Sequence, residues 1–382
     1  MLKRAMPLEG IRVIEMSSYL AAPSCGRILA YLGADVIKVE MLGGDPWRKM
    51  GGLYEIPHND EDNPLFVVAN SGKRFLSVDL KTTGGMEVFL KLINTANVFI
   101  TNFMDSSLRK LHVTYEDLSA IRPSLVYGRV VGYGEKGEEA NRPGFDATAY
   151  YARGGLMLDY VQKGAPPNNF MYGGGDAITA LSLTAGVLAG LAGVQLHGEG
   201  CSICASLLHS AVWTASMNYV ISQYDENYHI DRVYRCKDGA YVFVQAVTEK
   251  QKLALCDIIG ITPEEYDDRR KIIPRLREIY SQKTFDEWSE LFSHTNICIE
   301  RLRYLKEVPF DEQALCNKFL VSYCGSEGKE IHMSMPPIQF EGAPDYVSDE
   351  FRTGKDTRQI LYELGYSSEI IERLSSDKVI SI

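Results

Sequence analysis

The stretch with the clearest capacity for chemistry is Gly173-Gly174-Gly175-Asp176, in which three glycines precede a single carboxylate. The apolar run that follows, 180–196, predicts a buried helix. An aspartate at the start of a helix can act as its N-cap, where unpaired amide groups favour negative charge. Because its neighbours carry no side chains, Asp176 is also approachable enough to act as a nucleophile. The local pattern leaves both interpretations open and favours the cap.

A second set of residues is placed to bind a ligand at the ends of predicted strands. Short apolar segments alternate with helical segments up to about residue 135, which predicts a doubly wound α/β domain with a parallel sheet. Such sheets bind ligands at the carboxyl ends of their strands, and the side chains expected there are Tyr19, Lys73, Asn102 and Tyr133. The loop 17–23 contains no glycine, so the Gly-x-Gly-x-x-Gly fingerprint of dinucleotide-binding proteins is absent.

Several candidates also have ordinary structural interpretations. Lys73 and Arg74 begin a predicted strand, where a pair of cations is either solvated or in contact with the phosphate of an anionic ligand. Lys110 has the same two interpretations. Asp146 is expected to cap the helix predicted after it, and Tyr150 on that helix is expected to pack rather than react.

Composition and charge limit the kind of protein. The 382 residues are 45% hydrophobic and 24% charged, which is ordinary for a globular protein of two or three domains. A net charge of −10 argues against a nucleic-acid partner, which would need a basic surface. The apolar segment 178–196 contains Thr, Ser and Gly, so a core helix explains it better than a membrane span.

The eight cysteines form no regular framework. Cys201-x-x-Cys204 has no second pair or histidine at zinc spacing, so we expect no metal site. Free thiols are typical of a reducing cytoplasm. The basic N-terminal residues are not followed by the apolar segment of a signal peptide, and we therefore expect a cytoplasmic protein.

The alternating pattern ends near residue 224, where a smaller domain is expected to begin. An Asp238-Gly239 turn inside 234–244 predicts a hairpin, and charged amphipathic helices follow it. The expected layout is a large α/β domain of residues 1–224, a smaller α+β domain of residues 225–340, and a C-terminal segment, 341–382, that returns to the large domain.

The order and spacing of several short motifs make the chain resemble the class III CoA-transferases, the family of formyl-CoA and carnitine CoA-transferases. The matching segments are 8–15, 21–23, 32–40, 70–74, 101–103, 132–134, 143–146, Gly175-Asp176 and 237–239. Segments 19–25, 132–137 and 144–155 are most similar to the fermentative 2-hydroxyisocaproate and phenyllactate CoA-transferases. The resemblance implies a Rossmann-like large domain, a smaller α+β domain and an interlocked homodimer.

The resemblance places the catalytic nucleophile on Asp176. A carboxylate is ionised at neutral pH and can attack a thioester carbonyl without a general base. The implied intermediates are an acyl-aspartyl anhydride and then an aspartyl-CoA thioester, from which an acceptor acid takes the CoA. Gly173, Gly174 and Gly175 are implied to give the thioester room, and their amides to stabilise its oxyanions.

The family's ligand contacts carry over to two groups of residues. The implied CoA contacts are Tyr19, Leu20, Ala21, Lys73, Arg74, Asn102, Phe103, Lys110 and Tyr133. The implied substrate pocket includes Phe145 and Tyr150. The implied partners are acyl-CoA and a small carboxylic acid such as a 2-hydroxy acid, with coenzyme A as a substrate and no permanently bound cofactor, metal, nucleic acid or membrane.

Two departures from formyl-CoA transferase concern its CoA contacts. Leu20 replaces a Gln and Met41 replaces an Arg, which argues against a formyl or oxalate substrate and removes one implied phosphate contact. That enzyme's glycine-rich lid loop also has no counterpart between residues 224 and 235.

Two other functions remain as alternatives. In the related α-methylacyl-CoA racemases, a His with an acid/base role precedes the Asp of a Gly-x-Asp motif. Phe145 holds that position here and cannot exchange protons. A non-catalytic CoA-binding protein on the same fold is the other alternative, and an intact Asp176 argues against it.

Overall fold

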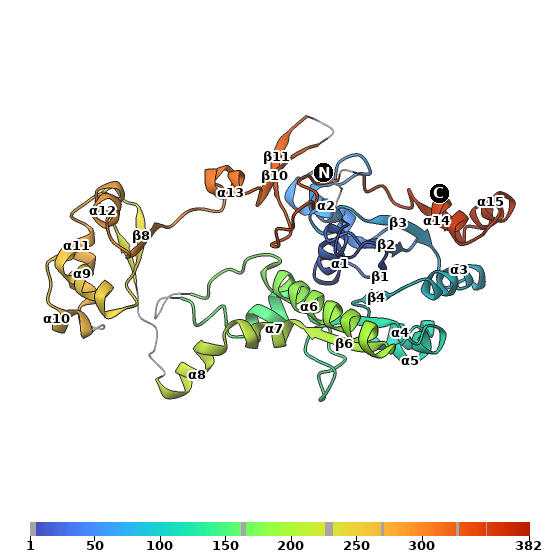
Figure 1. Cartoon of the computed structure of the whole chain (residues 1–382), viewed down its shortest axis with the longest axis horizontal. Coiled ribbons are helices and arrows are strands. Elements are labelled where there is room, and N and C mark those ends of the chain that lie inside the picture. The colour runs from blue at the N-terminus through green and yellow to red at the C-terminus, as the bar shows by residue number, and fades with distance from the viewer. Residues whose placement is uncertain (1–4, 162–165, 226–231, 269–270, 326–327, 349) are drawn as a thin grey trace. The chain divides into compact units, whose positions relative to one another are not determined.

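The computed structural model describes residues 5–161, 166–225, 232–268, 271–325, 328–348 and 350–382. These residues form two compact units (Figure 1). The larger unit combines Met1–Ser216 with Glu312–Ile382, and the smaller unit is Met217–Asp311.

A seven-stranded sheet in the order β12-β3-β2-β1-β4-β5-β6 forms the centre of the larger unit. The strands are β1 (Arg12–Met16), β2 (Asp35–Glu40), β3 (Arg74–Val78), β4 (Val98–Thr101), β5 (Val126–Val131), β6 (Cys201–Ser206) and β12 (Ile380–Ser381). All neighbours pair in parallel except β12, which runs antiparallel to β3. The strand order reverses at β1, whose neighbours are β2 and β4, and doubly wound sheets open a ligand crevice at such a position.

Helices cover both faces of this sheet, because its strands alternate apolar side chains toward each face. Val13 packs on one face with α1 (Ala21–Tyr31) and α6 (Gly174–His197). Ile14 packs on the other face, which is covered by three helices from the first third of the chain and two from its C-terminal part (Figure 1). These are α3 (Thr83–Asn94), α4 (Asp105–Leu111), α5 (Tyr115–Ile121), α14 (Thr357–Glu363) and α15 (Ser368–Ser376). The doubly wound parallel sheet that the sequence predicts is confirmed.

Shorter elements complete the larger unit. They are η1 (Pro46–Tyr54), α2 (Pro64–Asn70), the π-helix η2 (Asp146–Ala152), α7 (Leu207–Thr214), α13 (Glu312–Cys316) and the antiparallel pair β10 (Leu320–Cys324) and β11 (Glu330–Ser334). Tyr323 of β10 and Met333 of β11 pack in one cluster with Phe66, Phe75 and Phe351. This cluster ties the β10–β11 hairpin to α2 and β3.

The smaller unit has its own core beneath a three-stranded antiparallel sheet. Its strands are β7 (Val233–Arg235), β8 (Tyr241–Gln245) and β9 (Cys298–Arg301), with β8 in the middle. Its helices are α8 (Ser216–Tyr224), which begins at the boundary, α9 (Glu249–Ile259), α10 (Pro263–Asp267), α11 (Ile273–Tyr280), α12 (Phe285–Phe292) and the short η3 (Val308–Phe310). Tyr234 stacks on Tyr280 with ring centroids 4.6 Å apart, and the buried Trp288 indole donates to the Tyr280 carbonyl at 3.0 Å.

The boundaries of the compact units differ from those expected from the sequence. The smaller unit begins at Met217 rather than 225 and ends at Asp311 rather than 340. Strands β10 and β11 form a sheet of their own. Tyr323, Ile331 and Met333 of these strands pack in the cluster that contains Phe66 and Phe75 of the larger unit.

Helix α6 carries the longest apolar segment. Among the described helices, it is the one long and apolar enough to span a membrane by length and composition. Its inner side contributes Leu183 and Val187 to the core beside Val126 of β5. Only 33% of its apolar window is buried, so the fully buried helix that the sequence predicts is not what the structure shows.

The core of the smaller unit gives a direct test of its packing. We expect Phe292→Ala to lower the free energy of unfolding by about 3–5 kcal/mol, because the ring is 2% exposed and its removal leaves a cavity. The neighbouring Leu291 is 44% exposed, and Leu291→Ala should cost about 0.5 kcal/mol or less. Urea denaturation of both variants measures the difference, and equal losses would contradict this packing.

Candidate active site

An open pocket of about 400 Å³ lies in the larger unit at the crevice where the strand order reverses. The loop after β1 and the loop after β4 form two of its walls, and the start of α6 contributes Asp176. The residues singled out in the sequence that line it are Tyr19, Leu20, Ala21, Asn102, Phe103, Phe145 and Asp176. The fold therefore brings segments far apart in the chain together around one carboxylate.

Asp176 lies in the first turn of α6 and is not its N-cap. Gly173 occupies the N-cap position with φ 76°, and Asp176 is the third residue of the helix. The expectation that Asp176 caps this helix is therefore wrong. A tight left-handed turn, which glycine adopts without strain, starts the helix instead. The half-buried carboxylate is left to face the pocket.

The carboxylate that holds the start of α6 is Asp146, the first residue of η2. Its Oδ2 accepts a hydrogen bond from the Gly173 amide at 2.8 Å, and its Oδ1 accepts one from the Gly175 amide at 2.9 Å. The expectation that Asp146 caps its own helix is corrected, because Phe145 is the N-cap residue there. Asp146 therefore caps a helix that begins almost thirty residues later in the chain.

Asp146 also changes the ionisation of Asp176. Burial, together with the negative charge of Asp146, raises the pKa of Asp176 to about 7. The sequence predicted a fully ionised nucleophile at neutral pH, and this is corrected. With its pKa raised this far, the Asp176 carboxyl group is no longer fully ionised at neutral pH.

The amides of the three glycines have partners of their own. Those of Gly173 and Gly175 donate to Asp146, and that of Gly174 donates to the Met171 carbonyl at 3.2 Å. An N–H group has one proton to donate, so this arrangement does not leave them free to stabilise an oxyanion. The glycines instead allow close packing. A Cβ added at Gly174 would lie 2.2 Å from Tyr151 Oη.

The loop after β1 carries a strained residue into the pocket. Tyr19 has φ 65°, a left-handed conformation that is costly for a non-glycine residue. Asn102 holds the preceding residue from both sides, because its Oδ1 accepts from the Ser18 amide at 3.0 Å and its Nδ2 donates to the Ser18 carbonyl at 2.7 Å. The Tyr19 ring meets Phe145 edge to face, with centroids 5.7 Å apart.

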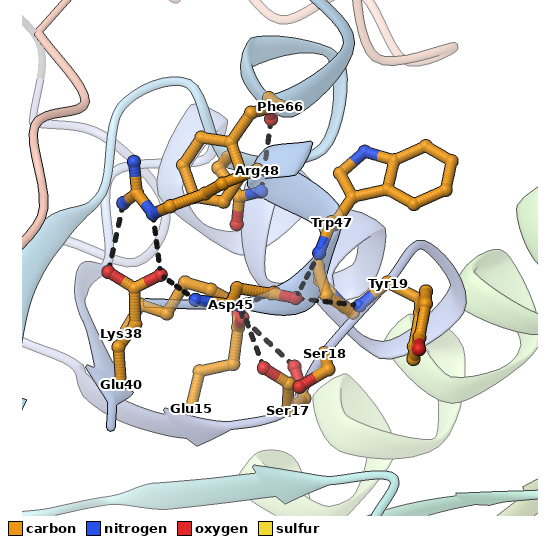
Figure 2. A network of polar contacts seen from close by, with 12 residues as sticks. Glu15, Ser17, Ser18, Tyr19, Lys38, Glu40, Asp45, Trp47, Arg48 and Phe66 are labelled. Atoms are coloured by element: carbon orange, nitrogen blue, oxygen red, sulfur yellow. Dashed lines mark hydrogen bonds and ion pairs between the residues drawn. The ribbon is translucent and has the colours of Figure 1, made fainter. Parts of the chain in front are cut away.

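A buried ionic network stands behind this loop (Figure 2). Lys38 of β2 is fully buried, and its Nζ has three acceptors: Glu15 Oε1 at 2.9 Å, Asp45 Oδ2 at 3.0 Å and the Ser17 carbonyl at 2.8 Å. Burial favours the neutral form of Lys38, but the carboxylates of Glu15 and Asp45 outweigh it and raise its pKa above the ordinary value. The lysine is therefore charged, donates hydrogen bonds to Glu15 and Ser17, and forms an ion pair with Asp45.

Asp45 links this network to the pocket. Its Oδ1 accepts from the Trp47 amide at 2.9 Å and from the Tyr19 amide at 3.3 Å, as Figure 2 shows. The Asp45 amide in turn donates to Glu40, which pairs with Arg48 at 2.9 Å. Sequence reasoning missed Asp45, although an Asp followed by Pro is a recognisable helix start.

Lys73 belongs to the same buried network and does not line the pocket. Its Nζ contacts Glu15 Oε2 at 2.7 Å, the Pro23 carbonyl at 2.8 Å and Asn70 Oδ1 at 2.8 Å. Burial, with the charge of Lys38, lowers the pKa of Lys73 to about 8. Lys73 therefore contacts buried groups of the protein, whereas the sequence led us to expect a contact with a CoA phosphate.

Four further expected ligand residues lie away from the pocket lining. Arg74 pairs with Asp35 at 2.8 Å and with Glu363, and Lys110 is exposed on α4. Tyr133 lies beneath the Arg142 guanidinium, 5.0 Å from its ring centroid. Tyr150 is buried among apolar side chains and donates to Thr214 Oγ1 at 3.1 Å, so it packs as its helical position suggested.

Two pocket residues that sequence reasoning missed are arginines. Arg129 of β5 contacts Glu135 at 3.2 Å and Asp105 at 3.7 Å, and Arg142 pairs with Glu139. A single cation on a strand or in a loop carries no signal that separates it from any surface residue. Among the described residues, no three His, Cys, Asp or Glu side chains gather as they would around a metal ion.

The chain belongs to CoA-transferase family III, which matches residues 8–356. It is therefore a class III CoA-transferase, and the resemblance drawn from the short motifs is confirmed. It is 33% identical to (R)-2-hydroxy-4-methylpentanoate CoA-transferase of Clostridioides difficile over 98% of this chain and 100% of that protein. It is 31% identical to cinnamoyl-CoA:phenyllactate CoA-transferase of Clostridium sporogenes over 98% of this chain and 97% of that protein.

The fold is also similar to that of solved structures. A CAIB/BAIF family protein from Brucella suis superposes with a TM-score of 0.78 and 24% identity, covering 94% of this chain and 100% of that chain. At this identity the likeness concerns the fold alone.

Two separate glycine-to-alanine substitutions on helix α6 test the close packing of Gly175. A Cβ at Gly175 would lie 2.2 Å from Tyr150 Cγ and 2.5 Å from Asp146 Oδ1, so Gly175→Ala should cost about 1–3 kcal/mol. Gly193 of the same helix has nothing within 4 Å of such a Cβ, and Gly193→Ala should stabilise by about 0.5–1 kcal/mol. Chemical denaturation compares the two, and effects of the same sign would count against the packing of Gly175.

The buried network gives a second test. Lys38→Met leaves the Glu15 and Asp45 carboxylates buried without their shared cation, so we expect a loss of about 3–5 kcal/mol in unfolding free energy. Arg74→Met removes a partly exposed ion pair from the neighbouring strand and should cost about 1 kcal/mol. Urea denaturation measures both values, and a Lys38→Met loss no larger than that of Arg74→Met would show that the network is not a stabilising unit.

Proposed function

We propose that this enzyme moves CoA from an acyl-CoA thioester to a small carboxylic acid, with Asp176 as the covalent carrier. The observation that carries the proposal is the position of the Asp176 carboxylate, which lines one open pocket with Tyr19, Leu20 and Phe103. Among the described residues that line the pocket there is no histidine, and Phe145 holds the position before Asp146 where the racemases have their acid/base His. Proton abstraction of the racemase type therefore has no support at this position.

The proposed reaction needs no net proton transfer. An ionised Asp176 oxygen attacks the thioester carbonyl, the carbon–sulfur bond breaks, and CoA leaves as a thiolate from a mixed anhydride. The thiolate then attacks the aspartyl carbonyl, which releases the donor acid and forms an aspartyl-CoA thioester. The acceptor carboxylate attacks that carbonyl and displaces the thiolate. The thiolate finally attacks the acceptor's acyl carbon, which forms the new acyl-CoA and restores Asp176.

The proposed acceptor is a 2-hydroxy acid with an apolar side chain. The relatives from C. difficile and C. sporogenes are named for acids of this kind. The ring of Phe145, 58% exposed, and the edge of Tyr19 offer an apolar wall beside Asp176. We assign the loop segments 19–21 and 102–103 to CoA, which binds as a substrate and not as a resident cofactor.

The proposed assembly is an interlocked homodimer in the cytoplasm. Large apolar side chains stand exposed on the larger unit, including Leu196 at 76% and Trp213 at 74%. A partner copy would cover such side chains. The same proposal holds that the enzyme has no metal, nucleic-acid or membrane partner.

Trapping the covalent intermediate tests the role of Asp176. Asp176→Ala should lower the transfer rate at least about 10³-fold and leave CoA affinity within a few-fold, because the carrier is lost while the loops remain. Hydroxylamine added with an acyl-CoA should give a hydroxamate at residue 176 of the native enzyme. Mass spectrometry locates the adduct, and a sample without acyl-CoA is the control. Transfer that survives in Asp176→Ala, or no adduct together with exchange of the α-proton, would contradict the mechanism.

A further inference from the structure

Asp146 is a buried carboxylate that the reaction described above does not use. It is 7% exposed, and both of its oxygens point at the backbone that begins α6. Burial raises the pKa of Asp146, while hydrogen bonds from the amides of Gly173, Gly175 and Asp176 oppose that rise. The first-turn amides, which would normally favour a negative charge on the residues of their own helix, are thus directed at a carboxylate from another element.

Within the part of the chain that the structure describes, no cation is paired with either of these two carboxylates. Among the ion pairs of the described residues, none includes Asp146 or Asp176, and the pocket cations Arg129 and Arg142 pair with other acids. The charges of both carboxylates also act on Tyr151 of η2, whose pKa is raised first by burial and then by Asp146 and Asp176. The charge of Asp146 therefore acts on Asp176 in a partly desolvated site, and the amide hydrogen bonds of the described residues there go to Asp146.

We propose that Asp146 is a positioning residue for the transfer reaction, holding the glycine segment that carries Asp176 and placing a second negative charge beside the nucleophile. The inference rests on the proposed function of Asp176. A more basic carboxylate is a stronger nucleophile, but a smaller fraction of it is ionised. The balance is best when the group titrates near the working pH. Asp146 thus sets both the direction and the reactivity of the attacking oxygen.

Asp146→Asn removes the negative charge and one of the two acceptor oxygens, so it is compared with Asp146→Glu. Asparagine keeps one carbonyl oxygen for an amide but lacks the charge, whereas Asp146→Glu keeps the charge. Asp117→Asn is the matched control, because Asp117 is also an aspartate that accepts from a backbone amide, that of Thr114 at 3.0 Å, and it lies outside the pocket.

The measurement is the titration of the Asp176 carboxyl group by infrared difference spectroscopy, with Asp176→Asn as the reference. This titration needs no turnover, so its result tests the effect of Asp146 on Asp176 even if the enzyme does not transfer CoA. We expect a midpoint near pH 7 in the native enzyme. We also expect a shift of roughly one pH unit or more to the acid side in Asp146→Asn, with no shift in Asp117→Asn.

The pH dependence of kcat/KM should shift in the same direction as the titration midpoint of Asp176. Only the ionised form attacks, so kcat/KM should fall as the pH drops through the Asp176 midpoint, and Asp146→Asn should retain its rate to lower pH. An unmoved midpoint in Asp146→Asn, or an equal shift in Asp117→Asn, would overturn the inference. If Asp146→Asn does not fold, the titration midpoints of the native enzyme and of Asp146→Glu test the inference. A native midpoint near the ordinary aspartate value of about 4 would overturn the inference, and one near 7 that Asp146→Glu keeps would support it.

Discussion

The interaction on which the ligand pocket depends most is the triple contact of the Lys38 ammonium group with Glu15, Asp45 and the Ser17 carbonyl. It joins two neighbouring strands to the loops that follow them, in the part of the sheet where water is excluded. Charges buried this deeply persist only when each has its partners, so the groups hold one another in a single arrangement. The loop that carries Tyr19 is held by the same groups, because the Tyr19 amide donates to Asp45 and the Ser17 carbonyl accepts from Lys38.

The pocket thus combines a rigid base with strained parts. Tyr19 keeps its left-handed backbone because its amide donates a hydrogen bond to Asp45. Asn102 also forms hydrogen bonds with both the backbone amide and the backbone carbonyl of Ser18, the preceding residue. At the start of α6, Asp146 holds the glycine turn in front of Asp176. In both places a carboxylate or amide from a distant segment fixes the backbone that presents a pocket residue. The reactive geometry therefore depends on tertiary hydrogen bonds more than on local sequence.

This dependence explains what the sequence predicts and what it does not. The strands and the crevice follow from apolar periodicity, and the glycines before Asp176 mark a helix start, so these features were predictable. Lys73 was misplaced because a pair of cations at a strand end is usually exposed, and only the fold shows that Glu15 lies against it. The partners of the glycine amides were equally hidden, since Asp146 is almost thirty residues away.

The edge strand β12 has a consequence for the making of the protein. It covers the outer side of β3, and it consists of residues 380 and 381, which lie some three hundred residues after β3 in the sequence. A chain leaving the ribosome has released Met217–Asp311 long before these residues emerge. Until then the main sheet has an open edge, and open edges pair with other chains. Residues 380 and 381, which emerge after the whole of the smaller unit, thus close this edge of the sheet against aggregation during biogenesis.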